Sequence, residues 1–565
     1  MIYSDVKKTV QQIYNASYRF AKPPEKPLLT AIAGDGKVTL YWDNRAEKTF
    51  DAFYQRYNFE GYRIYRSTEA NFIESKTITD AYGKATFRKP LVQFDLIDGI
   101  KGLHPIDVNG ALFNLGTDSG LKHSYTDSTV QNGQTYYYAV SAYDKGFIIT
   151  NVEGSVEGIP PSETATIFRT DVNGNITVDV NTAVITPRAP AAGYVAPEIS
   201  ELFVSGPATG VVSIDVLDQD SVKNFHSYRL EFENDEPFNN GAKPFYSLID
   251  YTDKDTLINN IQLAGLEEQT IVTDGFSMNI KNDSLVQVDN DKTKWLNGNS
   301  NFIMSVGFDS RFSAAYQGKR VDYPADFKIT LTEPGQGQIS YPATAFSQPI
   351  QSNVLVENLT ENKESIQFIF RDENKNLIFD EGDAIFIVYG DSAGKPVVNR
   401  NDIRVTWSLS IIRDTTIAEE LQKAPEFGDV FKIVTKKPYR TGEYIEFVTK
   451  SQGFDKSKAS SDLENIYVVP NPYSGAASWE RTSNSVGRGE RKIQFMNLPN
   501  KCTIRIYSLN GKLVQTLIHN TTFSDGQEAW NLISKDGMDI AYGVYVFHID
   551  APGIGEKIGR FAIIK

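Results

Sequence analysis

Hydrophobic and polar residues alternate along most of the chain. The alternation is clear in LLTAIAGDGKVTLYWD (28–43), where a Gly-Asp-Gly turn separates two such runs, and it returns in FEGYRIYRS (59–67) and QTYYYAVSAYDKG (134–146). A period of two places every second side chain on one face of a β-strand, and short strands joined by Gly- and Asn-containing turns are typical of sandwiches. We therefore expect an all-β protein made of antiparallel β-sandwich modules in series.

The first twenty residues break this pattern. Their apolar side chains recur at roughly helical spacing, namely Val6, Val10, Ile13, Tyr14 and Phe20. This spacing predicts one short N-terminal helix within a lead-in at 1–25. The same stretch lacks the charged, apolar and small-residue order of a secretory signal peptide.

Further changes of pattern divide the rest of the chain. Residues 166–198 contain the Pro- and Ala-rich run VITPRAPAAGYVAP, which predicts an extended connector. Strand-like runs fill 26–165 before it and 199–455 after it, the latter including VVSIDVLD, YRLEFEN, FIMSVGF, DFKITLTE, SIQFIFRD and AIFIVYG. In 466–565 strands and turns recur about every ten residues, which predicts a smaller terminal sandwich.

Region 26–165 resembles a fibronectin type III domain. The residues that carry the resemblance are Trp42, Tyr62-Arg63-Ile64-Tyr65-Arg66, Asn132-Gly133 and the run from Tyr136 to Tyr143. One departure is residues 70–122, which stand where that family has a short connection. This insertion is either a decorated loop or a partner-binding surface, since rigid sandwiches present function on their loops.

Region 466–565 closely resembles the C-terminal sorting domain (type A) of type IX secretion cargo in Bacteroidota and their relatives. The matching residues are Pro470, Asn471, Pro472, Ile504-Arg505-Ile506-Tyr507, Asn510, Gly511, Trp530, Ala541, Gly543, Val544, Tyr545 and the final Lys565. The resemblance implies that the closing strand and basic end are a signal read by the outer-membrane export machinery. The alternative is a purely structural immunoglobulin-like cap, with Asn510-Gly511 turning a hairpin and Trp530 filling a core.

The sharpest chemical motif is DENKNLIFDEGD (372–383) in the middle region. Its oxygen-bearing side chains follow EF-hand spacing at positions one, three, five, nine and twelve, with a backbone carbonyl at seven: Asp372, Asn374, Asn376, Asp380, Asp383 and Ile378. Leu377 replaces the usual turn glycine, and an aspartate replaces the longer final glutamate, so reduced affinity is expected. The motif predicts a structural Ca²⁺ site. A solvated Asp/Asn hairpin loop is the alternative.

Charge and composition narrow the classes of partner. The chain of 565 residues has 71 acidic and 57 basic residues, a net charge of -14 and a pI near 5.1, which disfavours nucleic acid and anionic lipid. No apolar run approaches the ~20 residues that cross a bilayer, so membrane insertion is not expected. The lone Cys502 excludes an internal disulfide but leaves the compartment open.

The sequence offers no support for catalysis. Its five histidines are scattered, and neither HExxH nor a phosphate-binding glycine loop is present. His548 lies in a strand-like run, and Cys502 lies beside β-branched residues, so both are interpreted as structural. The chain is therefore expected not to be an enzyme.

Together these features predict a secreted or outer-surface modular protein with a structural or adhesive role, exported by the type IX secretion system. Its expected partners are the export machinery and, further, other copies of itself or surface proteins. Two alternatives remain at this point. One is a subunit of an extracellular filament or sheath, and the other is a glycan-binding or glycan-cleaving secreted protein.

Overall fold

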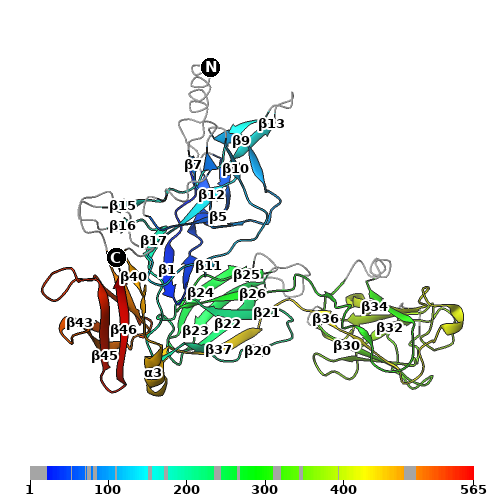
Figure 1. Cartoon of the computed structure of the whole chain (residues 1–565). Helices are drawn as coiled ribbons and strands as arrows, with labels where there is room; N and C mark the ends of the chain where they lie inside the picture. The colour runs from blue at the N-terminus through cyan, green and yellow to red at the C-terminus, as the bar shows by residue number, and fades with distance from the viewer. Residues whose placement is uncertain are drawn as a thin grey trace.

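The protein is all-β, as predicted, and the strands of the described residues form mostly antiparallel sheets (Figure 1). The computed structural model describes residues 22–51, 54–69, 72, 78–79, 85–108, 111–150, 156–170, 176–234, 244–263, 267–308, 320–342, 348–391, 394–475 and 491–564. The only α-helix among these residues is α3, Lys456–Asp462, which begins at the capping side chain of Asp455. The predicted N-terminal helix falls in 1–21, outside the described residues.

The first body, residues 29–185, is a sandwich of a three-stranded and a four-stranded sheet. The sheets have the orders β1-β2-β11 and β17-β12-β5-β8. The bounds are Leu29–Gly34 (β1), Lys37–Trp42 (β2), Phe59–Ser67 (β5), Val92–Asp95 (β8), Ser124–Asp127 (β11), Tyr136–Asp144 (β12) and Thr182–Ile185 (β17). Alternate residues of both sheets meet in one core around Trp42 and Tyr62, whose ring centroids are 5.6 Å apart. Because β17 completes the second sheet, this body continues beyond residue 165.

The segment 70–122, expected as an insertion, contributes both to this sandwich and to smaller hairpins. Its strand β8 is the edge strand beside β5, and Gly61 is needed there because a Cβ would lie 2.3 Å from the carbonyl oxygen of Phe94. The short hairpins of the first body are β3–β4, β6–β7, β9–β10, β13–β14 and β15–β16. Their bounds are Phe50–Asp51, Arg56–Tyr57, Ile78–Thr79, Ala85–Phe87, Leu103–Val108, Ala111–Asn114, Phe147–Thr150, Val156–Ile159, Phe168–Thr170 and Ile176–Val178.

The second body is built from two separate parts of the chain, residues 198–281 and 437–450. One sheet has the order β19-β37-β22-β23-β24 with β20 also on β37, and the other has the order β21-β26-β25. The bounds are Glu198–Ile199 (β19), Phe203–Ser205 (β20), Val211–Val216 (β21), Ser227–Glu233 (β22), Phe245–Asp250 (β23), Asp255–Gln262 (β24), Glu267–Gln269 (β25), Phe276–Lys281 (β26) and Tyr444–Lys450 (β37). Strand β37 lies between β22 and the short strands β19 and β20, and Ser227 of β22 pairs with Val448 of β37.

The third body, residues 286–435, is inserted between these two parts. Its sheets have the orders β28-β35-β30-β31 and β29-β34-β33-β32 around a core of their own. The bounds are Lys294–Trp295 (β28), Ile303–Gly307 (β29), Phe327–Leu331 (β30), Val354–Asn358 (β31), Phe368–Arg371 (β32), Ala384–Tyr389 (β33), Arg404–Ile412 (β34) and Val430–Ile433 (β35). The region 199–455, expected as one sandwich region, therefore contains three hydrophobic clusters, one in the second body and two in the third.

The C-terminal body, residues 463–564, contains one three-stranded and one five-stranded sheet, ordered β39-β41-β44 and β40-β46-β45-β42-β43. The bounds are Tyr467–Val469 (β39), Tyr473–Ser474 (β40), Ile493–Met496 (β41), Lys501–Ser508 (β42), Leu513–Asn520 (β43), Glu528–Trp530 (β44), Gly543–Ala551 (β45) and Gly555–Ile564 (β46). The pairing of β40 with β46 is parallel, whereas β45 and β46 form an antiparallel pair. Trp530 and Phe561 bring the two sheets together in one core.

The second body lies at the centre of the molecule, with the first and C-terminal bodies against it and the third body projecting away (Figure 1). The Pro- and Ala-rich connector docks on the C-terminal body, where the Ala191 N–H donates to the Phe523 carbonyl at 2.9 Å. Arg188 also forms an ion pair with Asp525 at 2.9 Å. Contacts of this kind hold the connector in place, so it does not act as a free linker.

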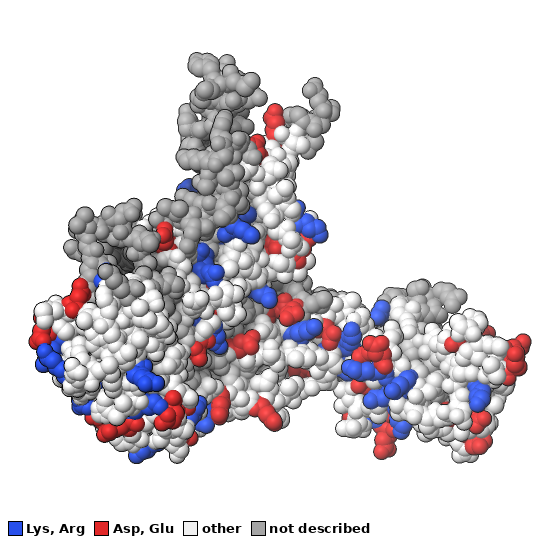
Figure 2. All heavy atoms as spheres, viewed as in Figure 1, with Lys and Arg blue, Asp and Glu red and all other residues white. Residues whose placement is uncertain are grey.

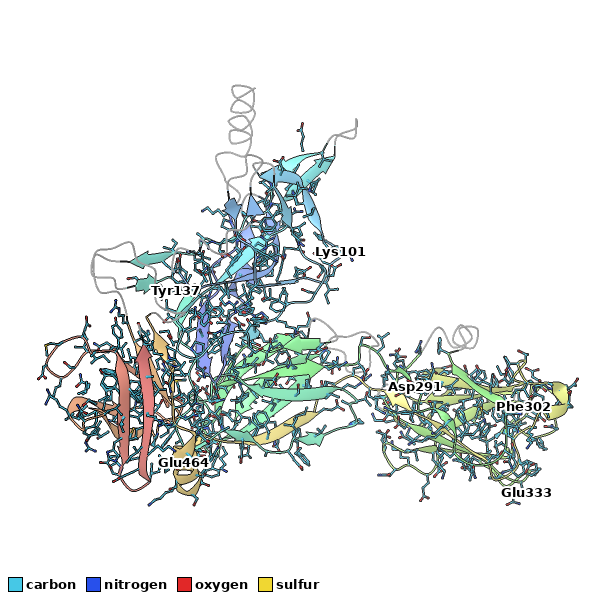
Figure 3. The ribbon with its side chains drawn as sticks, in the orientation of Figure 1. Lys101, Tyr137, Asp291, Phe302, Glu333 and Glu464 are labelled. Carbon is cyan, nitrogen blue, oxygen red and sulfur yellow. The ribbon has the colours of Figure 1, made fainter. Side chains whose placement is uncertain are left out.

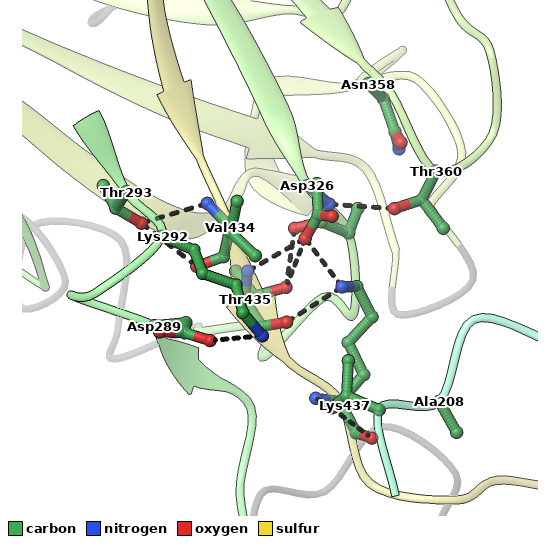
Figure 4. Close-up of polar contacts among 12 residues, drawn as sticks. Ala208, Asp289, Lys292, Thr293, Asp326, Asn358, Thr360, Val434, Thr435 and Lys437 are labelled. Atoms are coloured by element: carbon green, nitrogen blue, oxygen red, sulfur yellow. Dashed lines mark hydrogen bonds and ion pairs between the residues drawn. The ribbon is translucent and has the colours of Figure 1, made fainter. Parts of the chain in front are cut away.

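The third body is attached through two strands, β27 (Gln287–Val288) and β36 (Thr435–Lys436), which pair with each other. Beside them the buried ammonium of Lys437 donates to Asp326 Oδ1 at 2.6 Å and to the Thr435 carbonyl at 2.8 Å (Figure 4). The backbone of Lys437 in turn exchanges hydrogen bonds with Thr209 of the second body. This network joins the second and third bodies at the point where the chain crosses between them.

Candidate functional site

The calcium-type motif forms the loop between β32 and β33. These strands pair in antiparallel register from Phe368–Ile387 to Arg371–Ala384, so the two ends of the loop are brought together. Phe379, at the eighth position of the motif, is buried in the core of the third body. Its N–H donates to Asn353 Oδ1 at 2.8 Å, which anchors the second half of the loop.

The structure brings the predicted ligand side chains together. Asp380 accepts hydrogen bonds from the amides of Asn374, at 3.1 Å, and Asn376, at 2.6 Å. Asp372 accepts from the backbone N–H groups of Asn376, at 3.2 Å, and Leu377, at 2.9 Å. The side chains therefore converge inside the loop, and the two amides would have to turn their oxygens inward to bind a cation.

The backbone of the loop explains the first departure from the EF-hand pattern. Leu377, in the place of the turn glycine, has a φ of 65°, and Lys375 has a φ of 62°. The left-handed region costs a residue with a Cβ about 1–2 kcal/mol. Leucine therefore adopts the turn that glycine would adopt freely, and the carbonyl of Ile378 follows this turn at the seventh position.

Asp383, at the twelfth position, is buried and accepts the N–H groups of Glu373 at 2.9 Å and Asp380 at 3.1 Å. Burial raises the pKa of its carboxyl above the ordinary value, and the negative charges of Asp380 and Asp372 raise this pKa further. Among the described residues, no Lys or Arg forms an ion pair with Asp372, Asp380 or Asp383. A donor set made only of oxygens, with three carboxylates and no cationic side chain, fits Ca²⁺.

A second group of side chains that could bind a metal ion lies in the second body, but the ammonium group of a lysine already pairs with its carboxylates. His226 Nδ1 is 2.8 Å from Asp250 Oδ2, with Asp253 close by. The Lys223 ammonium reaches Asp250 at 3.2 Å, Asp253 at 2.9 Å and Asp274 at 3.2 Å. Its hydrogen bond with Asp253 is the largest of the interactions that raise the pKa of Lys223. This cluster is therefore a salt-bridge network centred on a lysine.

The residues that carry the sorting-domain resemblance surround the closing strand β46. Asn471, between Pro470 and Pro472, accepts the Ala562 N–H at 3.1 Å and donates to the Arg560 carbonyl at 3.5 Å. Its side chain thus covers the strand edge next to the short parallel pairing with β40. On the inner face, the ring centroid of Phe561 of β46 lies 6.1 Å from that of Trp530. The Phe561 ring also stacks on the Tyr545 ring, with 5.7 Å between the centroids.

The remaining motif residues shape the ends of the neighbouring strands. Gly543 begins β45 and pairs with Ile563 of β46. Asn510 and Gly511 form the turn between β42 and β43, where Gly511 has a φ of 76° and donates its N–H to the Ser508 carbonyl at 2.9 Å. Lys565 lies outside the described residues.

The groups considered for catalysis are held in structural contacts. His548 Nε2 lies 3.2 Å from the exposed Glu556 on the next strand. Cys502 is packed in the C-terminal core, and burial raises the pKa of its thiol to about 12, which keeps it protonated and weakly nucleophilic. A buried acid that the sequence did not single out is Glu60, whose nearest cation is the Lys145 ammonium at 3.5 Å. Burial raises the pKa of Glu60 to about 7.

The sequence gives no signal for Glu60, because it is a single acidic residue in a strand-like run and belongs to no motif.

The visible face of the molecule carries acidic and basic side chains in mixture over all four bodies (Figure 2). Among the described residues, no helix is long and apolar enough to span a membrane.

Comparisons with known proteins add little beyond the fold class. No protein family matches the chain, and no curated protein matches it. Similarity to solved structures is remote. PorZ, a surface component of the type-IX secretion system of Porphyromonas gingivalis, has 12% identity and a TM-score of 0.17, with 96% of this chain and 75% of that chain covered.

Two further solved structures are similarly distant. The FN1-FN3 domains of chicken CNTN1 have 8% identity and a TM-score of 0.11, covering 96% of this chain and 100% of that chain. Dimeric latent PorU of Porphyromonas gingivalis has 10% identity and a TM-score of 0.13, covering 75% of this chain and 41% of that chain. The neighbours thus include one surface component of a type-IX secretion system and one fibronectin-domain structure. TM-scores of this size carry no argument about function.

Proposed function

We propose that this chain is a secreted or surface-displayed, non-catalytic modular protein that is exported by the type IX secretion system. The observation that carries the proposal is the set of contacts around β46. Asn471, Trp530 and Tyr545, which carry the sorting-domain resemblance, all contact residues of this one strand. An export address that must be read as a folded element requires such a strand to be held in place.

The other bodies suit a structural or adhesive role. The first body docks on the C-terminal body, where Gln494 Nε2 donates to the Gly133 carbonyl at 2.8 Å. His123 N–H and Ser124 Oγ of the first body both bond the side chain of Gln269 in the second body. These contacts join the first body to the C-terminal and second bodies, and the third body projects away from the proposed export address (Figure 1).

Deleting residues 561–565 tests the export proposal. The deletion removes Phe561 from the core of the C-terminal body and the end of β46 from its sheet, so export to the cell surface is expected to fail in a host with the type IX machinery. Surface labelling and fractionation of the full chain, carrying a Sec signal, measure the result. The first, second and third bodies should stay folded, because each has its own core.

A reporter fusion provides the matched control. A reporter followed by residues 456–565 and preceded by a Sec signal is expected to reach the surface with the machinery and to remain periplasmic without it. Normal surface levels of the deletion variant would refute the export proposal and leave the C-terminal body as a structural cap.

We also propose that the loop 372–383 binds one structural Ca²⁺. The converging side chains and the buried Asp383 support this proposal. Because β32 and β33 flank the loop, the bound ion would join two strands of one sheet and stabilise the third body. No helix pair flanks the site, so a calcium-sensor opening is not expected.

The calcium proposal predicts a ligand-dependent change in stability. Millimolar Ca²⁺ should raise the melting temperature of the third body in the wild-type chain, because a ligand of the folded state alone stabilises that state. Asp380→Ala should remove most of this rise. Calorimetry with and without Ca²⁺, together with a direct titration, measures both effects.

The control variant is Asp536→Ala, which changes an exposed aspartate in a turn of the C-terminal body. It should retain the full calcium-dependent rise. Absence of Ca²⁺ uptake at millimolar concentration would favour the solvated hairpin loop.

A further inference from the structure

A pocket of about 350 Å³ opens beside the calcium-type loop in the third body. Figure 3 labels Phe302, one of its lining residues, at the end of this body remote from the second body, whereas Asp291 lies at the near end. The pocket is bounded by the loop residues 378–381, by the end of β34 and by the segment 413–428. Its position is therefore distal and accessible.

The wall formed by segment 413–428 is fixed by hydrogen bonds. Asn301 accepts the Lys423 N–H at 2.8 Å and donates its amide to the Leu421 carbonyl at 2.9 Å. At the other end, the Gly428 N–H donates to the Leu331 carbonyl at 2.7 Å. The wall is anchored at both ends, so the pocket is formed before any ligand arrives.

The pocket contains a buried donor that lacks a partner. Asn353 lines the pocket and is only 1% exposed. Its Oδ1 accepts the Phe379 N–H, whereas its Nδ2 has no acceptor among the described residues. An unpaired buried amide costs about 1–3 kcal/mol, and a ligand oxygen placed there would recover this energy.

The other walls supply an apolar surface and charged groups of both signs. Phe427, with 46% of its surface exposed, supplies an aromatic side chain to the lining, together with the buried Phe302 and Ile411. At the rim, Arg413 Nε donates to Glu381 Oε2 at 2.7 Å, and Asp380 lies alongside in the lining. The pocket therefore offers an aromatic face, an unpaired donor, acceptors and a guanidinium.

This combination discriminates between classes of ligand. An anionic ligand would be repelled by Asp380 and Glu381, and a cationic one would leave the Asn353 amide unpaired and face Arg413. A purely apolar side chain would bury the same amide without an acceptor. A neutral polyol with an apolar face satisfies the donor and the acceptors together, and pyranose sugars have this chemistry.

We propose that this pocket binds a pyranose residue of a glycan, with one sugar face on Phe427 and a ring or hydroxyl oxygen accepting from Asn353 Nδ2. The inference goes beyond the proposed export and scaffolding role. Its calcium dependence rests on the calcium proposal: Asp380 and Ile378 belong both to the loop and to the pocket, so bound Ca²⁺ would strengthen sugar binding by fixing this wall.

Binding of the methyl glycosides of glucose, galactose, mannose and N-acetylglucosamine to the full chain tests the proposal. Saturation-transfer NMR followed by calorimetric titration should detect at least one of them at millimolar concentration. Phe427→Ala should weaken binding by roughly tenfold, because it removes the aromatic wall. Asn353→Asp keeps the acceptor for Phe379 but removes the donor, and a comparable weakening is expected.

Phe203→Ala is the matched control, since Phe203 is an exposed phenylalanine on β20 of the second body. It should leave sugar binding unchanged. N-acetyl-phenylalanine amide serves as the apolar peptide probe. Failure of all four glycosides to bind, equal binding to the Phe427→Ala variant, or binding of the amide probe in their place would each overturn the sugar assignment.

Repeating the titration with a calcium chelator separates this proposal from the calcium proposal. Sugar binding that is unaffected by the chelator, in a chain that takes up no Ca²⁺, would remove the calcium site and leave the pocket. Ca²⁺ uptake without any sugar binding would refute the pocket assignment alone.

Discussion

Asp326→Ala is expected to lower the free energy of unfolding of the third body by about 3–5 kcal/mol, because it leaves the buried ammonium of Lys437 without its carboxylate. Asp326 Oδ1 accepts both the Lys437 ammonium, at 2.6 Å, and the Thr435 N–H, at 2.8 Å. Lys437 is only 3% exposed, so water cannot replace the lost partner. Hydrogen exchange of β30 and β35 amides in the full chain measures the change.

Replacing Lys437 should lower the free energy of unfolding of the third body much less than Asp326→Ala does. In Lys437→Met the apolar stem is retained and the buried charge disappears, while Asp326 keeps the Thr435 N–H and remains partly accessible to water. The double variant should therefore be more stable than Asp326→Ala alone. Small-angle scattering should also report a looser angle between the second and third bodies in Asp326→Ala.

The control for this pair is the exposed ion pair between Glu198 and Lys450, whose charged atoms are 3.1 Å apart. Glu198→Ala should change stability by no more than ~1 kcal/mol, the range of surface pairs. If Asp326→Ala also lowered the free energy of unfolding by no more than ~1 kcal/mol, water would have to reach the Lys437 ammonium.

Trp530→Ala is expected to destabilise the C-terminal body by about 3–5 kcal/mol, the usual cost of truncating a buried large aromatic side chain. Trp530 is fully buried, donates its indole N–H to the Ile533 carbonyl at 2.9 Å and contacts Phe561 of β46. The cavity would lie directly beneath the closing strand, so β46 should lose hydrogen-exchange protection first. Near-ultraviolet circular dichroism and hydrogen exchange on the full chain check this expectation.

Ile558→Ala is the comparison within the same strand. Ile558 is on the outer face of β46 and is exposed, so its truncation should stay within about 0.5 kcal/mol. If Trp530→Ala and Ile558→Ala lost similar amounts of stability, the position of β46 would depend more on its strand edges than on the core beneath it.

The local sequence pattern predicted those strands and turns whose conformation depends on their own residues. The runs in β2, β5 and β12 predicted these strands from local pattern, although nearly all residues of β5 and β12 are buried, so both faces of these two strands are covered. The spacing of DENKNLIFDEGD predicted a loop whose side chains converge, since the contacts between Asp372 and Asp383 lie within twelve positions. The bound ion itself stays a prediction.

Residue spacing gave no signal for the junction or the pocket. Lys437 and Asp326 are 111 positions apart, and Asn353, just before β31, meets Phe379 of the loop 26 positions further along the chain. Asn353 is an ordinary polar residue before a strand in the sequence, and it becomes a candidate ligand contact only through burial and an unpaired Nδ2. No periodicity marks such positions, because their environment is supplied by distant segments.

The sequence by itself determined the all-β class, the short strands and turns, and the ligand order of the calcium-type loop, because each depends on neighbouring residues. Only the tertiary structure decided that β37 returns to pair with β22, so that the third body is an insertion in the second. It also decided that Asn471 covers the edge of β46 and that Asn353 lines a pocket. Strand pairing across hundreds of residues is set by which apolar faces can be buried together, and this depends on the whole chain.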